Sequence, residues 1–388
     1  MTTLSIVADE NIPLVREYFS ALGEVTLVAG RHLQREQLLA ADVLLVRSVT
    51  HVNKALLEGT PVKFVGTATI GIDHLDTTYL QAAGITWANA PGSNANSVVD
   101  YVFSAFARLD GTLQQLLQGA TVGIIGMGNV GSRLYQRLHS LNVNTLAYDP
   151  LIAQDSYPNL TTLDTVLQAD IICCHAPLTE SGQWPSRHLL NEKTLEGLAD
   201  HAILINAGRG GVIDNIALKQ QLIKRPDLRV VLDVWENEPA IDIELLERVA
   251  IGTPHIAGYS LDGKQCGTTM IYQACCRALK EPQKAIVVEH TPVAIAINGV
   301  ESPEQCLKTA ILTCYDIQAD DQALRELIDL KVDRADEKGV KKRREAIFDG
   351  LRKNYPSRRE FSSCRIRHAD TLDASLKAQL NALGFSLD

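Results

Sequence analysis

The sequence predicts an α/β protein with two doubly wound parallel sheets and a smaller C-terminal α+β domain. The first observation is length, because 388 residues are more than one hydrophobic core normally holds. The second is a repeated alternation of short apolar runs with amphipathic helical stretches, which is typical of parallel strands joined by crossover helices. The third is a glycine-rich turn about one third of the way along the chain, which leaves room for a whole domain before it.

Two series of predicted strands precede the C-terminal region. The first series comprises residues 4–8, 24–28, 43–46, 64–66 and 86–88, with helical spacing between them, for example over 14–22. The second series comprises residues 121–125, 145–148, 171–174, 202–205, 230–232 and 251–253. Residues 95–117 have helical spacing and no strong helix breaker before Gly111, which predicts one long helix joining the two series.

The same patterns predict three domains. The first is formed by residues 1–94 and 257–288, the second by residues 95–256 and the third by residues 289–388. After about Glu289 the alternation of strands and helices weakens, and we expect no β-α-β ligand-binding domain of the regulatory kind there.

Composition and charge exclude several classes of protein. With 46% hydrophobic and 21% charged residues, and no apolar run near the roughly 18 residues of a membrane span, we expect a globular protein outside the membrane. The N-terminus lacks the basic start and apolar stretch of a secretory signal, which favours the cytoplasm. A net charge of -9 argues against nucleic acid as a partner. The eight cysteines have no metal-ligand or disulfide spacing, so we expect buried thiols and no metal site.

The turn after the predicted strand 121–125 has the spacing of a dinucleotide-binding loop. Gly126 permits the tight turn, Gly128 lets the backbone approach a pyrophosphate, and Gly131 allows close packing of helix on strand. Asn129 and Val130 would supply amide donors at the start of the helix. Asp149 follows the next strand, where its carboxylate would bind the adenosine ribose hydroxyls and repel a 2′-phosphate. Residues 95–256 are therefore predicted to be a Rossmann-like domain that binds NAD in preference to NADP.

Three further motifs follow strands of the second series, at the sheet edge where open parallel sheets bind ligands. They are Asn-Ala-Gly-Arg-Gly with Arg209, Asp-Val-Trp-Glu-Asn-Glu-Pro with Asp233 and Glu238, and Pro-His-Ile-Ala-Gly-Tyr with His255. A guanidinium can hold a carboxylate with two hydrogen bonds. Histidine is the side chain best matched to exchange a hydroxyl proton near neutral pH, and a carboxylate beside it orients the ring.

In this order, behind the glycine loop, the motifs resemble the D-isomer-specific 2-hydroxyacid dehydrogenases over about residues 1–285. The resemblance implies that Arg209 binds the substrate carboxylate and polarises the α oxygen, that His255 exchanges the proton of the 2-hydroxyl, and that Glu238 pairs with His255. It implies that Asp233 holds the nicotinamide carboxamide. The other cofactor contacts that it implies, besides the glycine loop and Asp149, are Ala176, Ala207, Gly208, Arg209 and Gly258.

A narrower resemblance is to the branch of this family that oxidises a phosphorylated four-carbon sugar acid in vitamin B6 synthesis. It rests on residues 46–50, 65–69, 255–259 and 351–360. It implies that Ser48, Thr69 and Tyr259 contact the substrate together with Arg209, that residues 1–94 and 257–288 are the substrate-binding domain, and that the C-terminal domain forms a homodimer.

Two alternatives stay open at this point. Another member of the family, of the phosphoglycerate dehydrogenase or hydroxypyruvate reductase type, would share every catalytic residue. A dinucleotide-sensing corepressor would keep the same fold and residues as a binding module. His175, a rival catalytic histidine, follows a strand on the cofactor side and lacks a Glu-x-Pro partner, so we expect it to line the nicotinamide site.

The C-terminal region is basic although the chain as a whole is acidic. Residues 331–368 contain thirteen Lys and Arg against six Asp and Glu. A charge run is usually a solvated face. The second interpretation is that arginines of this region attract a substrate phosphate across a dimer interface, with Arg47 as the competing ligand in the first domain. The candidates are Arg344, Arg352, Arg358 and Arg359.

Overall fold

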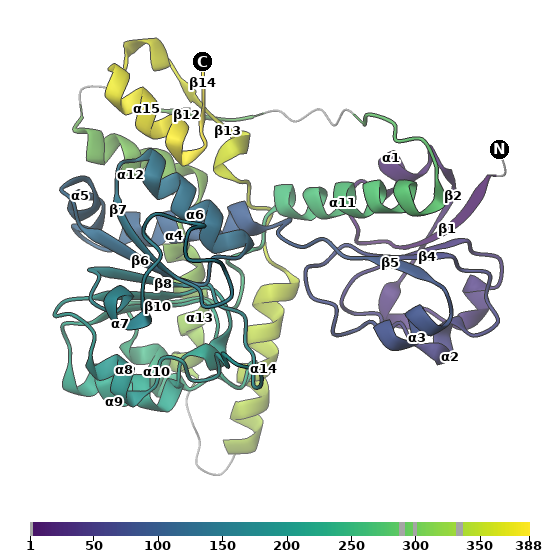
Figure 1. The fold of residues 1–388 in the computed structure, drawn as a ribbon, viewed down its shortest axis with the longest axis horizontal. Coiled ribbons are helices and arrows are strands. Elements are labelled where there is room, and N and C mark those ends of the chain that lie inside the picture. The colour runs from purple at the N-terminus through teal and green to yellow at the C-terminus, as the bar shows by residue number, and fades with distance from the viewer. Residues whose placement is uncertain (1–2, 287–291, 298–300, 331–336) are drawn as a thin grey trace. The chain divides into compact units, whose positions relative to one another are not determined.

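The computed structural model describes residues 3–286, 292–297, 301–330 and 337–388, which form two compact units (Figure 1). The first unit contains Met1–Asn94 and Ser260–Thr291, and the second contains Ala95–Tyr259 and Pro292–Asp388. The C-terminal residues are thus grouped with the predicted cofactor-binding domain, and their treatment as a separate domain stays a prediction. Among the described residues, no helix has the length and apolar content needed to cross a membrane.

The first unit is built on a five-stranded parallel sheet with the order β2-β1-β3-β4-β5. The strands lie close to the predicted ranges and are β1 (Leu4–Asp9), β2 (Gly23–Val28), β3 (Val43–Val46), β4 (Phe64–Thr67) and β5 (Thr86–Ala88). The helices are α1 (Val15–Phe19), α2 (Lys54–Leu57), α3 (Thr77–Ala82) and α11 (Leu261–Leu279). Successive strand residues face opposite sides, so that Ile6 packs in one core with Ile271 of α11 and Val7 packs in another with Leu80 of α3.

The second unit contains a six-stranded parallel sheet with the order β11-β10-β9-β8-β6-β7. The strands are β6 (Thr121–Ile125), β7 (Asn144–Tyr148), β8 (Ile171–Cys174), β9 (Ile203–Asn206), β10 (Arg229–Leu232) and β11 (Ile251–Gly252). The helices that accompany them are α4 (Ala95–Arg108), α5 (Thr112–Leu117), α6 (Asn129–Ser140), α7 (Leu163–Val166), α8 (Glu192–Glu196), α9 (Asn215–Lys224) and α10 (Ile243–Arg248). Both faces of this sheet are buried, which explains why its strands read as continuous apolar runs.

The single long helix predicted over residues 95–117 is two helices, α4 and α5. Gly111 has a φ of 73° and is the residue before Thr112, the first of α5. A left-handed residue cannot continue a right-handed helix, and glycine adopts this conformation at no steric cost. The prediction was wrong because α4 already ends at Arg108, before Gly111, where the sequence has no strong helix breaker.

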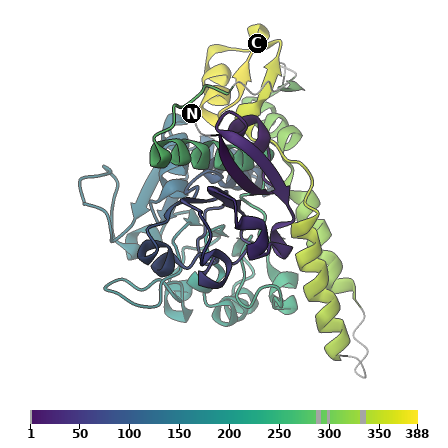
Figure 2. The ribbon, with the colours of Figure 1, turned by 90° about the vertical axis from the view of Figure 1, so that its right-hand side faces the viewer.

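The C-terminal part of the second unit has a three-stranded sheet of its own, with the order β12-β13-β14. Its elements are β12 (Val293–Ala296), α12 (Pro303–Cys314), α13 (Ile317–Asp329), α14 (Glu337–Lys353), β13 (Cys364–Arg367), α15 (Ala374–Leu383) and β14 (Ser386–Leu387). Figure 2 shows β13, β14 and α15 in yellow at one end of the unit, with α14 running away from them. Residues 331–336 of the basic segment lie outside the described residues.

A β-α-β unit does follow Glu289, because β13, α15 and β14 form one with parallel strands, so the expectation that no regulatory ligand-binding domain of this pattern lies there was wrong about the pattern. The strands are short, and in β12 only Ile295 is buried, so their hydropathy signal is weak. The new sheet and its helices share a hydrophobic core with the six-stranded sheet. Leu380 of α15 and Ile366 of β13 belong to the same buried cluster as Val99 of α4 and Leu138 of α6.

Candidate active site

The glycine loop has the shape that the sequence predicted. Gly126 has a φ of 90°, and a Cβ there would lie 2.7 Å from the amide nitrogen of Ala176. A Cβ on Gly131 would lie 1.9 Å from the carbonyl oxygen of Gly126, so α6 can approach β6 only through a glycine. A Cβ on Gly128 would meet no atom of the described residues within 4 Å. The loop therefore has open space in front of Gly128, which fits the close approach of a pyrophosphate.

Asp149 is tied to this loop. Its Oδ2 accepts a hydrogen bond of 2.8 Å from the amide of Met127, and its Oδ1 accepts one of 3.0 Å from the amide of Leu151. The carboxylate follows β7, beside β6, which is the position expected of a ribose ligand. Asp149 thus holds the backbone of the glycine loop in addition to the predicted role, which no contact here tests.

Glu238 and His255 form a direct pair. The Nδ1 atom of His255 lies 2.7 Å from Oε2 of Glu238, and Oε1 of Glu238 accepts a hydrogen bond of 2.9 Å from the amide of Trp235. The carboxylate is therefore fixed by the backbone at one oxygen and faces the imidazole with the other. His255 has a φ of 57°, which is uncommon for a residue with a side chain and is typical of functional positions. With Nδ1 engaged, Nε2 is the nitrogen that can exchange a proton.

Asp233 is buried beneath the His255 loop. Its Oδ1 accepts hydrogen bonds from Thr253 Oγ1 and from the amide of Ile256, and its Oδ2 accepts one from the amide of Ala257. Burial raises the pKa of Asp233, although the charge of His255 and these hydrogen bonds oppose the rise. Its carboxylate orients the loop that carries His255. The predicted contact with a nicotinamide carboxamide stays a prediction.

Arg209 is exposed on an otherwise buried or half-buried loop after β9, whose backbone is held by Asn206. The Nδ2 atom of Asn206 donates to the carbonyl of Arg209 at 3.1 Å, and its Oδ1 accepts from the amide of Gly208 at 3.1 Å. A Cβ on Gly210 would lie 2.0 Å from the carbonyl oxygen of Trp235, so glycine is required where the Arg209 loop meets the segment that leads to Glu238. Asn206 is fully buried and was not predicted as a site residue, although it opens the Asn-Ala-Gly-Arg-Gly motif.

The predicted substrate contacts are divided between the two units. Ser48 and Thr69 belong to the first unit, where β3 and β4 pair in a register that joins Val46 to Thr67. Residues two positions further along each strand therefore lie at the same carboxyl edge of the sheet. The hydroxyl of Thr69 donates to the carbonyl of Gly71 and contacts Thr67 Oγ1 at 2.7 Å. Tyr259 belongs to the second unit, four residues after His255.

Unlike His255, His175 has no hydrogen-bonded carboxylate in the described part of the chain, and both of its ring nitrogens are buried. Neither of its ring nitrogens is accessible to solvent or has a hydrogen-bond partner among the described residues. Burial lowers the pKa of His175 to about 4. It therefore stays neutral near pH 7, and its place beside the nicotinamide stays a prediction. The neighbouring predicted contacts Ala176, Ala207 and Gly258 are buried or half-buried.

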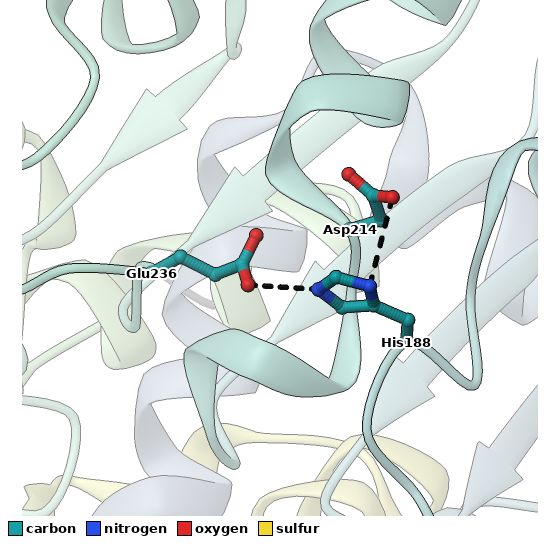
Figure 3. Close-up of side chains that lie close together, drawn as sticks. All are labelled: His188, Asp214 and Glu236. Atoms are coloured by element: carbon teal, nitrogen blue, oxygen red, sulfur yellow. Dashed lines mark hydrogen bonds and ion pairs between the residues drawn. The ribbon is translucent and has the colours of Figure 1, made fainter.

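One group of three metal-ligand side chains lies close together in the described part of the chain: His188, Asp214 and Glu236. Figure 3 shows the two carboxylates at opposite nitrogens of the ring, with Glu236 2.8 Å from Nε2 and Asp214 3.7 Å from Nδ1. A metal ion bound along the lone pair of either nitrogen would face only one carboxylate. The arrangement is that of a histidine bridging two acids, and it connects the loops around His188, Arg209 and Glu238.

The comparisons with known proteins concern the family and the fold. Residues 100–257 match the family described as D-isomer specific 2-hydroxyacid dehydrogenase, NAD binding domain, and residues 289–384 match a domain of unknown function, DUF3410. An erythronate-4-phosphate dehydrogenase from Cellvibrio japonicus is 50% identical over 386 residues, which are 98% of this chain and 99% of the relative. The chain belongs to the erythronate-4-phosphate dehydrogenase family. Another member of this family, from Edwardsiella ictaluri, is 46% identical with coverage of 98% and 99%.

Solved structures of other dehydrogenases share the fold of this chain over much of its length. A D-lactate dehydrogenase from Aquifex aeolicus, complexed with NAD and lactic acid, has a TM-score of 0.54 at 24% identity and covers 71% of this chain and 96% of its own. An NAD+-bound 3-phosphoglycerate dehydrogenase from Entamoeba histolytica has a TM-score of 0.58 at 21% identity, with coverage of 74% and 99%. At these identities the similarity concerns the fold alone.

Proposed function

We propose that this protein oxidises 4-phospho-D-erythronate to 3-hydroxy-2-oxo-4-phosphooxybutanoate, with reduction of NAD+ to NADH, as a step of vitamin B6 synthesis in the cytoplasm. The observation that carries the proposal is the Glu238–His255 pair, joined at 2.7 Å, in a chain with the glycine loop of a dinucleotide-binding domain. The family relationship supports the choice of substrate. The relatives that match this chain over almost their whole length are named erythronate-4-phosphate dehydrogenases.

The chemistry follows from the orientation of His255. Oε2 of Glu238 accepts a hydrogen bond from Nδ1–H of His255, so Nε2 of the neutral imidazole is free to accept a proton from the C2 hydroxyl. NAD+, when bound, accepts the hydride that leaves C2. The electrons of the O–H bond then form the carbonyl, and the proton passes from His255 to water. Glu238 stabilises the imidazolium that forms in this step.

Arg209 would bind the C1 carboxylate and polarise the C2 oxygen, because a guanidinium forms two parallel hydrogen bonds and stays charged. Ser48, Thr69 and Tyr259 would contact the hydroxyls of the sugar acid. NAD would be held by the glycine loop (Gly126, Gly128, Asn129, Val130 and Gly131), by Asp149, Ala176, Ala207, Gly208 and Arg209, and by Asp233 and Gly258. The open space at Gly128 supports this placement of the cofactor.

A comparison of substrates tests the proposal. Purified protein is incubated with NAD+ and, separately, 4-phospho-D-erythronate, 3-phospho-D-glycerate or D-glycerate, and NADH absorbance is followed. We expect kcat/KM for 4-phospho-D-erythronate to exceed the others by about 10-fold or more. A preference for 3-phosphoglycerate would assign the chain to the phosphoglycerate type. NAD binding without NADH formation from any acid would indicate a dinucleotide-sensing module.

We also infer that the protein is a homodimer joined through residues 289–388, as the narrower resemblance implies. The test is sedimentation of the full-length chain, for which a dimer has twice the chain mass of 42.4 kDa. Truncation at residue 289 is not a suitable test, because Ile366 and Leu380 complete the core of the cofactor-binding sheet. Sedimentation at the monomer mass would contradict the inference.

A further inference from the structure

The C-terminal segment places a buried arginine against the loop that carries His255. Arg358 is only 6% exposed, and its Nη2 donates hydrogen bonds of 2.6 Å to the carbonyls of Ala257 and Ser97. The sequence suggested Arg358 as a ligand of the substrate phosphate. Its burial and these two bonds give it a different role, because Nη2 is engaged inside the chain, while Nε and Nη1 are buried with no hydrogen-bond partner among the described residues.

Both peptide groups that flank the Cα of Ala257 are therefore held. Its amide donates to Oδ2 of Asp233 at 3.0 Å, and its carbonyl accepts from Arg358. Asp233 and Arg358 are both buried, so these charge-assisted bonds lie away from competing water. His255 comes two residues before Ala257 and Tyr259 two residues after it, so the bond to Arg358 fixes the backbone between two proposed contacts of the substrate.

A second contact reaches Tyr259 itself. The rings of Tyr259 and Tyr355 meet edge to face, with centroids 5.7 Å apart and an interplanar angle of 87°. The hydroxyl of Tyr355 donates to Oδ2 of Asp320 at 2.9 Å, which fixes the far end of its ring.

Tyr315 closes this network. Its hydroxyl donates to the same Asp320 oxygen at 2.7 Å, and its ring lies 3.9 Å below the guanidinium carbon of Arg358. Tyr355 and Arg358 are therefore coupled to each other through Asp320 and Tyr315. Arg358 contacts the backbone of Ala257, and Tyr355 contacts the ring of Tyr259. A shift of the C-terminal segment therefore changes the loop at two points.

The remaining contacts of this segment serve to dock it. Ser97 Oγ donates to Glu360 Oε1 at 2.7 Å, and the amide of Phe361 donates to Oδ2 of Asp100 at 2.8 Å. The ring of Phe361 stacks on Phe385 at 4.7 Å. These contacts involve α4 and the C-terminal sheet, whereas Tyr355 contacts the His255 loop and Arg358 contacts both that loop and α4 through Ser97.

We propose that Tyr355 and Arg358 are positioning residues for substrate oxidation, which hold the loop carrying His255 and Tyr259 in its productive conformation within the same chain. The proposal rests on the proposed function for the identity of the substrate. It gives the C-terminal domain, which matches a family of unknown function, a role in the active site besides assembly.

The test compares two pairs of variants with a control from the same segment. Arg358→Met removes both bonds to the carbonyls, and Arg358→Lys keeps the charge with a shorter reach. Tyr355→Leu removes the ring that faces Tyr259, and Tyr355→Phe removes only the bond to Asp320. The control, Phe385→Leu, removes a buried ring that stacks on Phe361 and makes no contact of this kind with the loop. Each is measured for kcat, KM for 4-phospho-D-erythronate, NADH affinity and thermal unfolding.

We expect Arg358→Met and Tyr355→Leu to lower kcat/KM for the substrate by roughly 10- to 100-fold, with NADH affinity close to that of the wild type. Arg358→Lys and Tyr355→Phe should recover part of this loss. Phe385→Leu should lower the melting temperature with kcat/KM retained. Wild-type kcat/KM in folded Tyr355→Leu and Arg358→Met, or an equal loss in Phe385→Leu, would overturn the proposal.

Amide hydrogen exchange gives a readout that needs no substrate. The amides of Ile256 and Ala257 donate hydrogen bonds to Asp233. Arg358→Lys should raise the exchange rate of these two amides by about 10-fold, whereas Phe385→Leu should leave their exchange rates unchanged. Unchanged exchange in Arg358→Lys would contradict the positioning role. A protein that oxidises none of the acids would instead refute the proposed function, and the exchange result would still decide whether the C-terminal segment holds the loop.

Discussion

The carboxylate of Asp149 accepts a hydrogen bond of 2.8 Å from the amide of Met127, in the middle of the glycine loop. A residue expected to choose between NAD and NADP therefore also fixes the shape of the pyrophosphate site, so its charge and its hydrogen bond need separate tests.

Asp149→Asn and Asp149→Ala separate the two effects. Both remove the charge that would repel a 2′-phosphate, so the ratio of kcat/KM for NADP to that for NAD should rise by about 10-fold or more. Asn keeps an acceptor for the Met127 amide, whereas Ala leaves that amide without its partner. We therefore expect Asn to retain more NAD affinity than Ala. An unchanged cofactor ratio in both variants would refute the assignment of Asp149.

The Glu238–His255 pair can be tested by changing the tautomer. His255→Ala should lower kcat by about 10²- to 10⁴-fold, with NAD affinity nearly unchanged. In Glu238→Gln the amide oxygen can still accept from Trp235, so the amide group donates to Nδ1 of His255 and the ring proton moves to Nε2. That nitrogen can then no longer accept a proton, and we expect a loss of kcat of similar size. Wild-type turnover in either variant would require another proton carrier.

Arg47 is the expected ligand of the substrate phosphate in the first unit. It precedes Ser48 at the carboxyl end of β3. Burial lowers the pKa of Lys264, and the charge of Arg47 lowers it further, so Arg47 lies close enough to Lys264 of the same unit for their charges to interact. Arg47→Ala should raise KM for 4-phospho-D-erythronate by about 10-fold or more, with little change in KM for NAD.

The matched control for Arg47 is Arg31→Ala, which removes an exposed arginine of the same unit. If KM for 4-phospho-D-erythronate is equal in Arg47→Ala and the wild type, backbone amides or an arginine of the C-terminal region must bind the phosphate instead. The arginines that remain as candidates are Arg344, Arg352 and Arg359. Of these, Arg344 donates to the carbonyl of Leu327 at 3.0 Å.

His175 should make the stability of the protein depend on pH. Burial lowers its pKa from the ordinary 6.5 to about 4, so the unfolded chain binds the proton first as the pH falls. Stability is then full above about pH 6.5 and is lost between about pH 6.5 and pH 4, by about 3 kcal/mol in the limit.

The free energy of unfolding is measured in urea across this range for the wild type, His175→Gln and the exposed control His32→Gln. The His175 variant should show the flatter profile, and the control should follow the wild type. Parallel profiles for the wild type and His175→Gln would show that His175 does not titrate as a buried group.

Apolar runs predicted the strands of both large sheets, because they are local patterns, whereas the Glu238–His255 pair was implied by the resemblance of the ordered motifs to a known family. The fixation of the Arg209 loop by Asn206 was within reach, since a buried asparagine before a glycine turn has few other partners. The bond from Arg358 to Ala257 was not. It joins residues 101 positions apart through a backbone carbonyl, and a carbonyl has no identity that a sequence could reveal.

Leu380 and Leu138, from α15 and α6, are buried in one cluster, and this has a consequence for how such proteins diverge. A substitution that enlarges a side chain in α15 must be matched by a smaller one in α6 or α4, because packed interiors tolerate little change in volume. Positions of the C-terminal extension should therefore covary with positions of the dinucleotide-binding domain across relatives. A chimera that exchanges residues 289–388 between distant members should fold only when α4 and α6 are exchanged with them.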